Sequence, residues 1–337
     1  MKRLLGNKAR ALNIILATLL LMMFTISANI AAESKATVIN CGYVDAIGSD
    51  IDLAQQKFAE LVEEKTKGNV IIKNFPASQL GSGVAQFEGV KMGTIGMFSD
   101  ALEYGGKLID EFNIQSMGFL FKDMDHLGRY LKSEIHTELR ERLAKAHGIR
   151  IVADNWYRTP RVMFAKKPIY SIDDLKGLKM RVPDIRMYLL VWEALGTKPS
   201  RVAWGEIYLA LKQGVVDAAE GPLDTIYGMK FYEAAPYVIR TDHLWTVNAL
   251  FMNEKLFASL SPENQALLIE AAEEAGDWLT EHTFANTERD MEQMKKLGTK
   301  FLDIDTAPFE AKLQTLAEKL EEEGMWEKGF YNKIKDM

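Results

Sequence analysis

Hydrophobic residues recur along this chain with two different spacings. Alternating apolar residues, or short apolar runs bounded by turn residues, predict β-strands, and apolar residues every three or four positions predict amphipathic helices. The predicted strands cover residues 36–43, 69–75, 94–99, 149–156, 161–165, 178–182, 215–222, 237–241 and 244–252. The predicted helices cover residues 50–67, 84–90, 123–132, 134–146, 185–195, 205–212, 261–285 and 308–334.

The order of these elements predicts an α/β fold. Strands and helices alternate over residues 36–99, which is typical of parallel strands joined by right-handed crossovers. A length of 337 residues is sufficient for two domains. We expect the chain to cross from one domain to the other near Arg158, just before Thr159-Pro160. The sequence contains no internal repeat and no low-complexity tract.

The N-terminal segment has the pattern of a secretory signal peptide. Four basic residues precede an apolar run over residues 11–26, and small residues end at Ala32. We expect cleavage after Ala32, which would make the mature protein periplasmic. The alternative is an uncleaved membrane anchor, but the apolar run is shorter than the roughly 20 residues that a spanning helix needs.

Charge and cysteine content exclude other classes of protein. Without residues 1–32 the chain has 37 basic and 47 acidic side chains and a net charge of −10, which argues against a nucleic-acid partner. The single cysteine, Cys41, cannot form an intramolecular disulfide. It lies in an apolar strand pattern without the residues that precede a lipidated cysteine, so we interpret it as a buried thiol.

The most informative stretch covers residues 177–222. Leu178, Met180 and Val182 alternate with two basic residues, so Arg181 lies at the carboxyl end of a strand that Pro183 terminates. Ligands of open α/β sheets collect at the carboxyl ends of strands. The planar guanidinium group donates two parallel hydrogen bonds to a carboxylate or phosphate, which makes Arg181 a candidate anion ligand. A solvated strand end is the alternative.

Four motifs in order, GLKMRVP, WGEIYLALKQGVVDAAEGP, KFYE and TDH, resemble the extracytoplasmic solute-binding proteins of TRAP transporters (tripartite ATP-independent periplasmic, DctP type). The resemblance implies a two-lobe periplasmic-binding-protein architecture with a central ligand cleft and a long helix that spans both lobes. It implies a monomer that captures a small organic acid anion and delivers it to an ion-driven membrane permease. Lobe I would comprise residues 33–158 and 247–286, and lobe II residues 159–246 and 287–337.

The resemblance also assigns arginines to the cleft. Arg181 matches the arginine that holds the ligand carboxylate, and Arg161 matches a second arginine that faces the cleft. Arg158 is a third candidate, and two or three arginines would also suit a dianion such as a phosphate ester. A surface ion pair is the alternative for Arg161.

Other motif positions complete the expected site. Trp204 stands where family members carry an aromatic residue against the ligand, and Glu220 and His243 match positions that orient Arg181. Many members have Asn where this chain has Gly221, so we expect this cleft to lose a hydrogen bond and gain room. These assignments leave open a structural role for each side chain.

Lobe I resembles the family less closely. Candidate ligand contacts lie at strand ends or helix starts, and Trp156 and Trp245 are alternative aromatic walls for which a core position is also open. The strand-end and helix-start candidates are Tyr43, Asp100, Asp45 and Ser82.

The sequence carries no catalytic or cofactor motif. The five histidines lack metal-ligand spacing, Gln86 replaces the third glycine of a dinucleotide loop, and no nucleophile elbow is present. We therefore expect no cofactor, no metal and no enzymatic activity. The alternatives to a transport protein are a phosphate-ester binder or ligand sensor of the same fold, and an exported enzyme.

Overall fold

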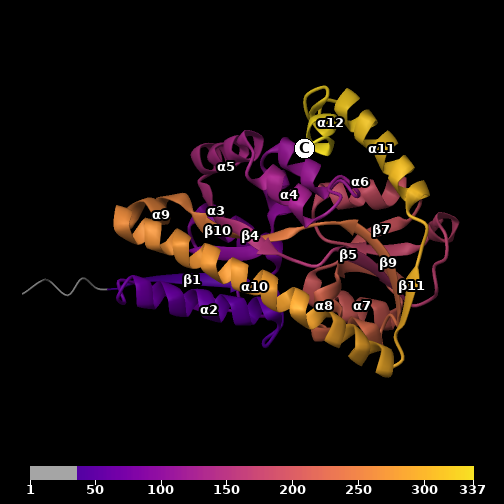
Figure 1. Cartoon of the computed structure of the whole chain (residues 1–337), viewed down its shortest axis with the longest axis horizontal. Coiled ribbons are helices and arrows are strands. Elements are labelled where there is room, and N and C mark those ends of the chain that lie inside the picture. The colour runs from indigo at the N-terminus through magenta and orange to yellow at the C-terminus, as the bar shows by residue number, and fades with distance from the viewer. Residues whose placement is uncertain (1–35) are drawn as a thin grey trace, which may run out of the picture. The chain divides into compact units, whose positions relative to one another are not determined.

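The computed structural model describes residues 36–337, and the compact unit Val38–Met337 contains two β-sheets covered by helices (Figure 1). The predicted signal peptide, residues 1–32, lies outside the described residues. No helix among residues 36–337 combines the length and the apolar character needed to cross a membrane.

The first sheet has the strand order β2-β1-β3-β10-β4. Strands β1 and β3 are parallel, as the strand–helix alternation predicts, whereas β10 runs antiparallel to β3 and β4. Helices α2 and α3 connect the first three strands. The elements are β1 (Thr37–Tyr43), α2 (Asp50–Lys65), β2 (Val70–Phe75), α3 (Gly83–Met92), β3 (Met97–Ala101), β4 (Ile149–Tyr157) and β10 (Val247–Asn253).

The second sheet has the strand order β11-β9-β5-β8-β6-β7. Strand β6 is parallel to β7 and β8, and β5 is antiparallel to β8 and β9. The strands are β5 (Arg161–Ala165), β6 (Lys179–Val182), β7 (Lys198–Arg201), β8 (Ala218–Pro222), β9 (Tyr237–Leu244) and β11 (Lys300–Asp303). The associated helices are α6 (Arg186–Ala194), α7 (Ile207–Gln213) and α8 (Leu223–Gly228).

The chain passes between the sheets several times. It leaves the first sheet after β4 and enters the second at β5, and it returns between β9 and β10. Strand β9 therefore belongs to the second sheet and β10 to the first. The lobe boundaries given above stay a prediction.

Helix α10 (Pro262–Lys296) connects the two sheets again. Ser261 caps its start by accepting a hydrogen bond from the backbone of Asn264, as the Ser-Pro-Glu sequence predicts. Its first half packs on β4, where the Trp156 indole donates to the carbonyl of Ala272 over 2.9 Å, and Met294 near its end packs with the second sheet. The helix extends well beyond the predicted end near residue 285. The sequence pattern does not reveal this last part, because few of its apolar side chains are buried and the helical period is lost.

The sequence pattern misses several short elements. The edge strands β7 and β11 have four residues each, and residues 102–116 form two 3₁₀-helices, Leu102–Lys107 and Asp110–Ser116. Strand β8 begins at Ala218, three residues after the predicted start, and ends at Pro222 as the sequence predicts. Strands of four residues are too short to show an alternating pattern, and 3₁₀-helices do not follow the 3.6-residue period of an α-helix.

The remaining helices of the first sheet's side are α4 (Met124–Leu131), α5 (Glu134–His147) and α9 (Glu254–Ser259). The C-terminal helices α11 (Ala307–Glu322) and α12 (Phe330–Lys335) touch both groups of elements. Helix α11 packs beside α6, and the carbonyl of Ile334 in α12 lies 2.8 Å from Nε2 of His126 in α4.

Gly276 allows α10 to lie close to β4. A Cβ atom there would stand 2.5 Å from both Asn155 Oδ1 and Trp156 Cδ1. We expect Gly276→Ala to lower the free energy of unfolding by about 1–3 kcal/mol, measured by denaturant unfolding, because the helix must move away from the strand. Gly228→Ala is the matched control, since a Cβ there meets nothing within 4 Å. Equal stability of the two variants would contradict this account of the helix contact.

Candidate functional site

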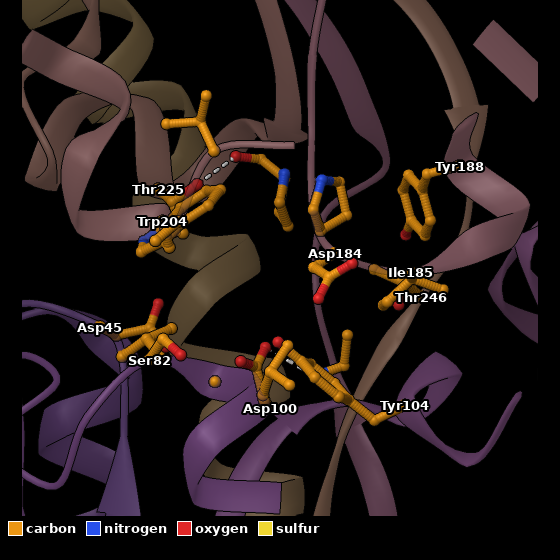
Figure 2. Close-up of a pocket in the computed structure, with 18 of the residues that line it drawn as sticks. Asp45, Ser82, Asp100, Tyr104, Asp184, Ile185, Tyr188, Trp204, Thr225 and Thr246 are labelled. Carbon is orange, nitrogen blue, oxygen red and sulfur yellow. Dashed lines mark hydrogen bonds between the residues drawn. The ribbon is translucent and has the colours of Figure 1, made fainter. Parts of the chain in front are cut away.

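A cavity of about 460 Å³ lies between the carboxyl ends of strands from both sheets. Figure 2 shows Asp45, Ser82, Asp100 and Tyr104 along one side, and Trp204, Asp184 and Tyr188 across from them. The first group follows strands β1 and β3 or begins α3, and the second group comes from the segments around β6 and α7. The position agrees with the rule that ligands of α/β sheets lie at strand ends.

Three buried arginines line this cavity: Arg158, Arg161 and Arg181. Their hydrogen-bond partners differ, and the difference decides what each guanidinium group can still bind. Buried guanidinium groups need partners, because removing their charge from water is costly.

Arg161 has a carboxylate partner within the protein. Its Nε and Nη2 atoms donate to the two oxygens of Glu220 over 2.6 and 2.7 Å, a bidentate ion pair between neighbouring strands β5 and β8. Burial alone would raise the pKa of Glu220, but Arg161 and the nearby His243 hold it at about 2. Glu220 in turn raises the pKa of Arg161, so the pair is charged at neutral pH although Glu220 is fully buried.

Arg158 is also paired, at the crossing between the sheets. It donates to Asp224 of α8 over 2.6 and 3.0 Å and to the side-chain oxygen of Asn248 on β10 over 3.0 Å. Asp45, which follows β1, lies 3.8 Å away. One guanidinium group thus connects elements of both sheets.

Arg181 is only 2% exposed and has no close carboxylate. Its Nε donates to the carbonyl of Val202 over 2.9 Å, but its Nη1 has no hydrogen-bond partner among residues 36–337. The nearest carboxylate oxygen, on Glu220, is 4.0 Å away and already engaged by Arg161. Burial lowers the pKa of Arg181 to about 10, so the group remains charged at neutral pH.

Trp204 forms part of the wall beside Arg181. The guanidinium carbon of Arg181 lies 5.4 Å from the indole ring, and the far edge of the indole packs against Phe231 with a ring separation of 5.2 Å. His243 lies behind the wall, with its Nε2 3.5 Å from Glu220 and its Nδ1 2.9 Å from the hydroxyl of Thr241.

The sequence placed two residues wrongly. Tyr43 does not line the cavity, because it is fully buried on the α2 side of β1 and donates to Asp52 over 2.6 Å. Gly221 does not enlarge the cavity, because a Cβ there would be 3.0 Å from the Trp204 ring, which fills that space. Trp156 is fully buried in the core, and Trp245 packs against the core without lining the cavity.

Several lining residues were missed by the sequence reasoning. Tyr104 lies just past the end of β3, and Tyr188 is a polar-tipped residue among the apolar positions of α6. Asp184, directly after β6, accepts from Arg201 over 2.9 Å, and its carbonyl accepts from Lys107 of the first 3₁₀-helix over 3.1 Å. Tyr104 and Asp184 could have been predicted as lining residues from the sequence, because each lies shortly after the end of a predicted strand.

Residues 42–323 match the bacterial extracellular solute-binding protein, family 7 (DctP). The chain belongs to this family. It is 29% identical to the 2,3-diketo-L-gulonate-binding periplasmic protein YiaO of Escherichia coli, over 84% of this chain and 85% of that protein. The two-lobe α/β fold predicted from the motifs is confirmed by these comparisons and by solved structures.

Two solved TRAP periplasmic solute-binding proteins illustrate the structural similarity. One, from Ochrobacterium anthropi with bound L-fuconate, has a TM-score of 0.85 and 29% identity, over 90% of this chain and 99% of that chain. The other, from Fusobacterium nucleatum with bound sn-glycerol-3-phosphate, has a TM-score of 0.84 and 26% identity, over 89% and 96% of the two chains. Family members are solute-binding proteins of transport systems.

Gly221 sets the position of the Trp204 ring. Gly221→Ala should push the indole into the cavity, because the ring edge is only 3.0 Å from the added Cβ and its other side is open. We expect affinity for an anion that the wild type binds to fall roughly 2- to 10-fold, the range of an aromatic contact, with little change in melting temperature. Isothermal titration calorimetry and thermal unfolding would measure both. Unchanged affinity would mean that Trp204 does not contact the ligand.

Proposed function

We propose that this protein is the extracytoplasmic solute-binding component of a TRAP-type secondary transporter. It captures a small organic acid anion through an ion pair between Arg181 and the ligand carboxylate, and it delivers the ligand to the membrane permease. In this proposal the mature protein is a periplasmic monomer that works by binding and release, without covalent chemistry.

One observation carries the proposal. Of the three buried arginines in the cavity, Arg158 and Arg161 donate to carboxylates at 2.6 Å, whereas Arg181 has an unsatisfied Nη1. A ligand carboxylate would supply the missing acceptors. Each charge-assisted hydrogen bond contributes about 1.5–3 kcal/mol, and exclusion of water strengthens the pair.

The same pairing explains how binding could favour closure of the lobes. A closed cleft without ligand would enclose an unpaired guanidinium group, which is unfavourable. An anion removes this cost and therefore shifts the population toward the closed state. Lys107, from the 3₁₀-helix after β3, already donates to the carbonyl of Asp184, which follows β6 and lines the cavity.

Arg181→Met tests the carboxylate pair. We expect at least a tenfold loss of affinity, because the variant removes at least one charge-assisted hydrogen bond of about 1.5–3 kcal/mol. Ligand-free protein should not lose stability, since the variant also removes an unpaired buried charge. Calorimetry and thermal unfolding of the mature protein would measure both.

Arg201→Met is the matched control for this variant. Arg201 also borders the cavity, but it is half exposed and pairs with Asp184, so its removal should change affinity far less. Equal losses from the two variants would show that Arg181 has no special role.

A phosphate ester is the second candidate ligand, because a similar structure holds sn-glycerol-3-phosphate. The neutralised Arg158 and Arg161 favour a monoanion over this dianion. A thermal-shift panel of sugar acids, small mono- and dicarboxylates, aromatic carboxylates and phosphate esters separates the two. A ligand at 100 times its Kd adds about 2.7 kcal/mol. We expect shifts with carboxylates, and shifts with phosphate esters alone would replace the carboxylate assignment.

A further inference from the structure

The cavity region contains more negative than positive charge. Beside the exposed pair of Asp184 and Arg201, five carboxylates lie in or next to the cavity with the three buried guanidinium groups. Glu220 pairs with Arg161, and Asp224 pairs with Arg158, which also lies 3.8 Å from Asp45. Glu103 lies outside the cavity lining and accepts from the hydroxyl of Thr246 over 2.8 Å. Asp100, which lines the cavity, has no basic side chain within 4.0 Å among residues 36–337. An excess acid therefore faces the cavity.

Asp100 is placed to meet a ligand. It is the second-to-last residue of β3, and its Oδ1 accepts from the next backbone amide, that of Ala101, over 2.7 Å. It lines the cavity beside Ser82 and Tyr104, and Figure 2 shows it across the cavity from Trp204. Because Arg181 contacts Trp204, the unpaired acid and the unpaired base lie on opposite sides of the cavity.

The surroundings of Asp100 do not neutralise it. Burial, and then the negative charge of Asp45, raise the pKa of Asp100 to about 7. Arg158 and Arg161 lower this pKa only in part. The phenol of Tyr104 is a neutral neighbour, since burial raises its own pKa. Burial also raises the pKa of Asp45. Two carboxyl groups whose ionised forms are disfavoured by burial thus share one side of the cavity, and a cation would stabilise both ionised forms.

We propose that the ligand carries a protonated nitrogen as well as a carboxylate, with the ammonium group against Asp100 and Asp45 and the carboxylate on Arg181. This inference rests on the proposed function and narrows its substrate class to zwitterions whose charges lie at opposite ends. At both ends of the cavity, the opposite charge of the ligand would pair with a buried group that the described residues leave without a counter-charge. A hydroxyl group would supply a hydrogen bond to Asp100 but would not balance its charge.

Matched pairs of amino and hydroxy acids test this inference. The pairs are 4-aminobutanoate with 4-hydroxybutanoate, 5-aminopentanoate with 5-hydroxypentanoate, and 6-aminohexanoate with 6-hydroxyhexanoate, titrated calorimetrically into the mature protein at pH 8. We expect the amino acid of at least one pair to bind at least tenfold more tightly than its hydroxy counterpart. Asp100→Asn should reduce the affinity for the amino acid at least tenfold more than for the hydroxy acid.

The pH dependence gives a readout that a merely structural role of Asp100 would not produce. Ammonium binding requires ionised Asp100, so affinity for the amino acid should fall about tenfold from pH 8 to pH 6 as a group with a pKa of about 7 takes up its proton. Affinity for the hydroxy acid should change much less. Asp100→Asn should remove most of this difference.

The outcomes separate the two proposals. If hydroxy acids bind as tightly as their amino counterparts and still depend on Arg181, the zwitterion is wrong and the proposed carboxylate site stands. If neither member of any pair binds, and the carboxylates of the thermal-shift panel also fail, both proposals are wrong. If neither the amino acids nor the hydroxy acids bind, but monocarboxylates of the panel that contain no nitrogen do, only the proposal of a zwitterionic ligand is wrong.

Discussion

The arrangement of this cleft follows from one constraint, the burial of three guanidinium groups within a single cavity. Arginine cannot lose its proton near neutral pH, so each buried group requires an acceptor. Glu220 and Asp224 supply acceptors for Arg161 and Arg158 within the protein. Arg181 donates to one carbonyl, and its Nη1 has no hydrogen-bond partner among the residues that the structure describes. In our proposal that partner is the ligand.

The order of the strands explains why Arg161 has a carboxylate partner and Arg181 does not. Strands β5 and β8 are antiparallel neighbours in the second sheet, which sets Arg161 diagonally opposite Glu220 on the same face. Arg181 comes from β6, on the other side of β8, where Glu220 is within 4.0 Å but directed toward Arg161. Arg158 lies where the chain crosses between the sheets, so its ion pair with Asp224 also holds elements of both sheets together. In the proposed function, ligand binding and the connection between the sheets therefore use the same class of interaction, an ion pair of a buried arginine.

The sequence predicted the features that depend on local pattern. Arg181 at a strand end, the cap of α10 and the parallel strands β1 and β3 could be derived because periodicity, Pro183 and Ser261 mark them directly. The motifs added Trp204, Arg161, Glu220 and His243, which the structure brings together. What could not be predicted was which charge pairs with which, since the ion pairs of Arg158 and Arg161 join residues more than 50 positions apart. The predictions for Tyr43 and Gly221 were wrong for a related reason. The side to which a residue at a strand end points, and the space next to a glycine, depend on residues that are distant in the sequence.

The most direct measurement is a crystal structure of the mature protein with a bound carboxylate from the thermal-shift panel. The account predicts that the carboxylate lies within hydrogen-bond distance of the terminal nitrogens of Arg181, with its body beside Trp204, while Arg161 remains bound to Glu220 and Arg158 to Asp224. A carboxylate that instead displaces Glu220 or Asp224 from its arginine, or that binds without touching Arg181, would contradict the account.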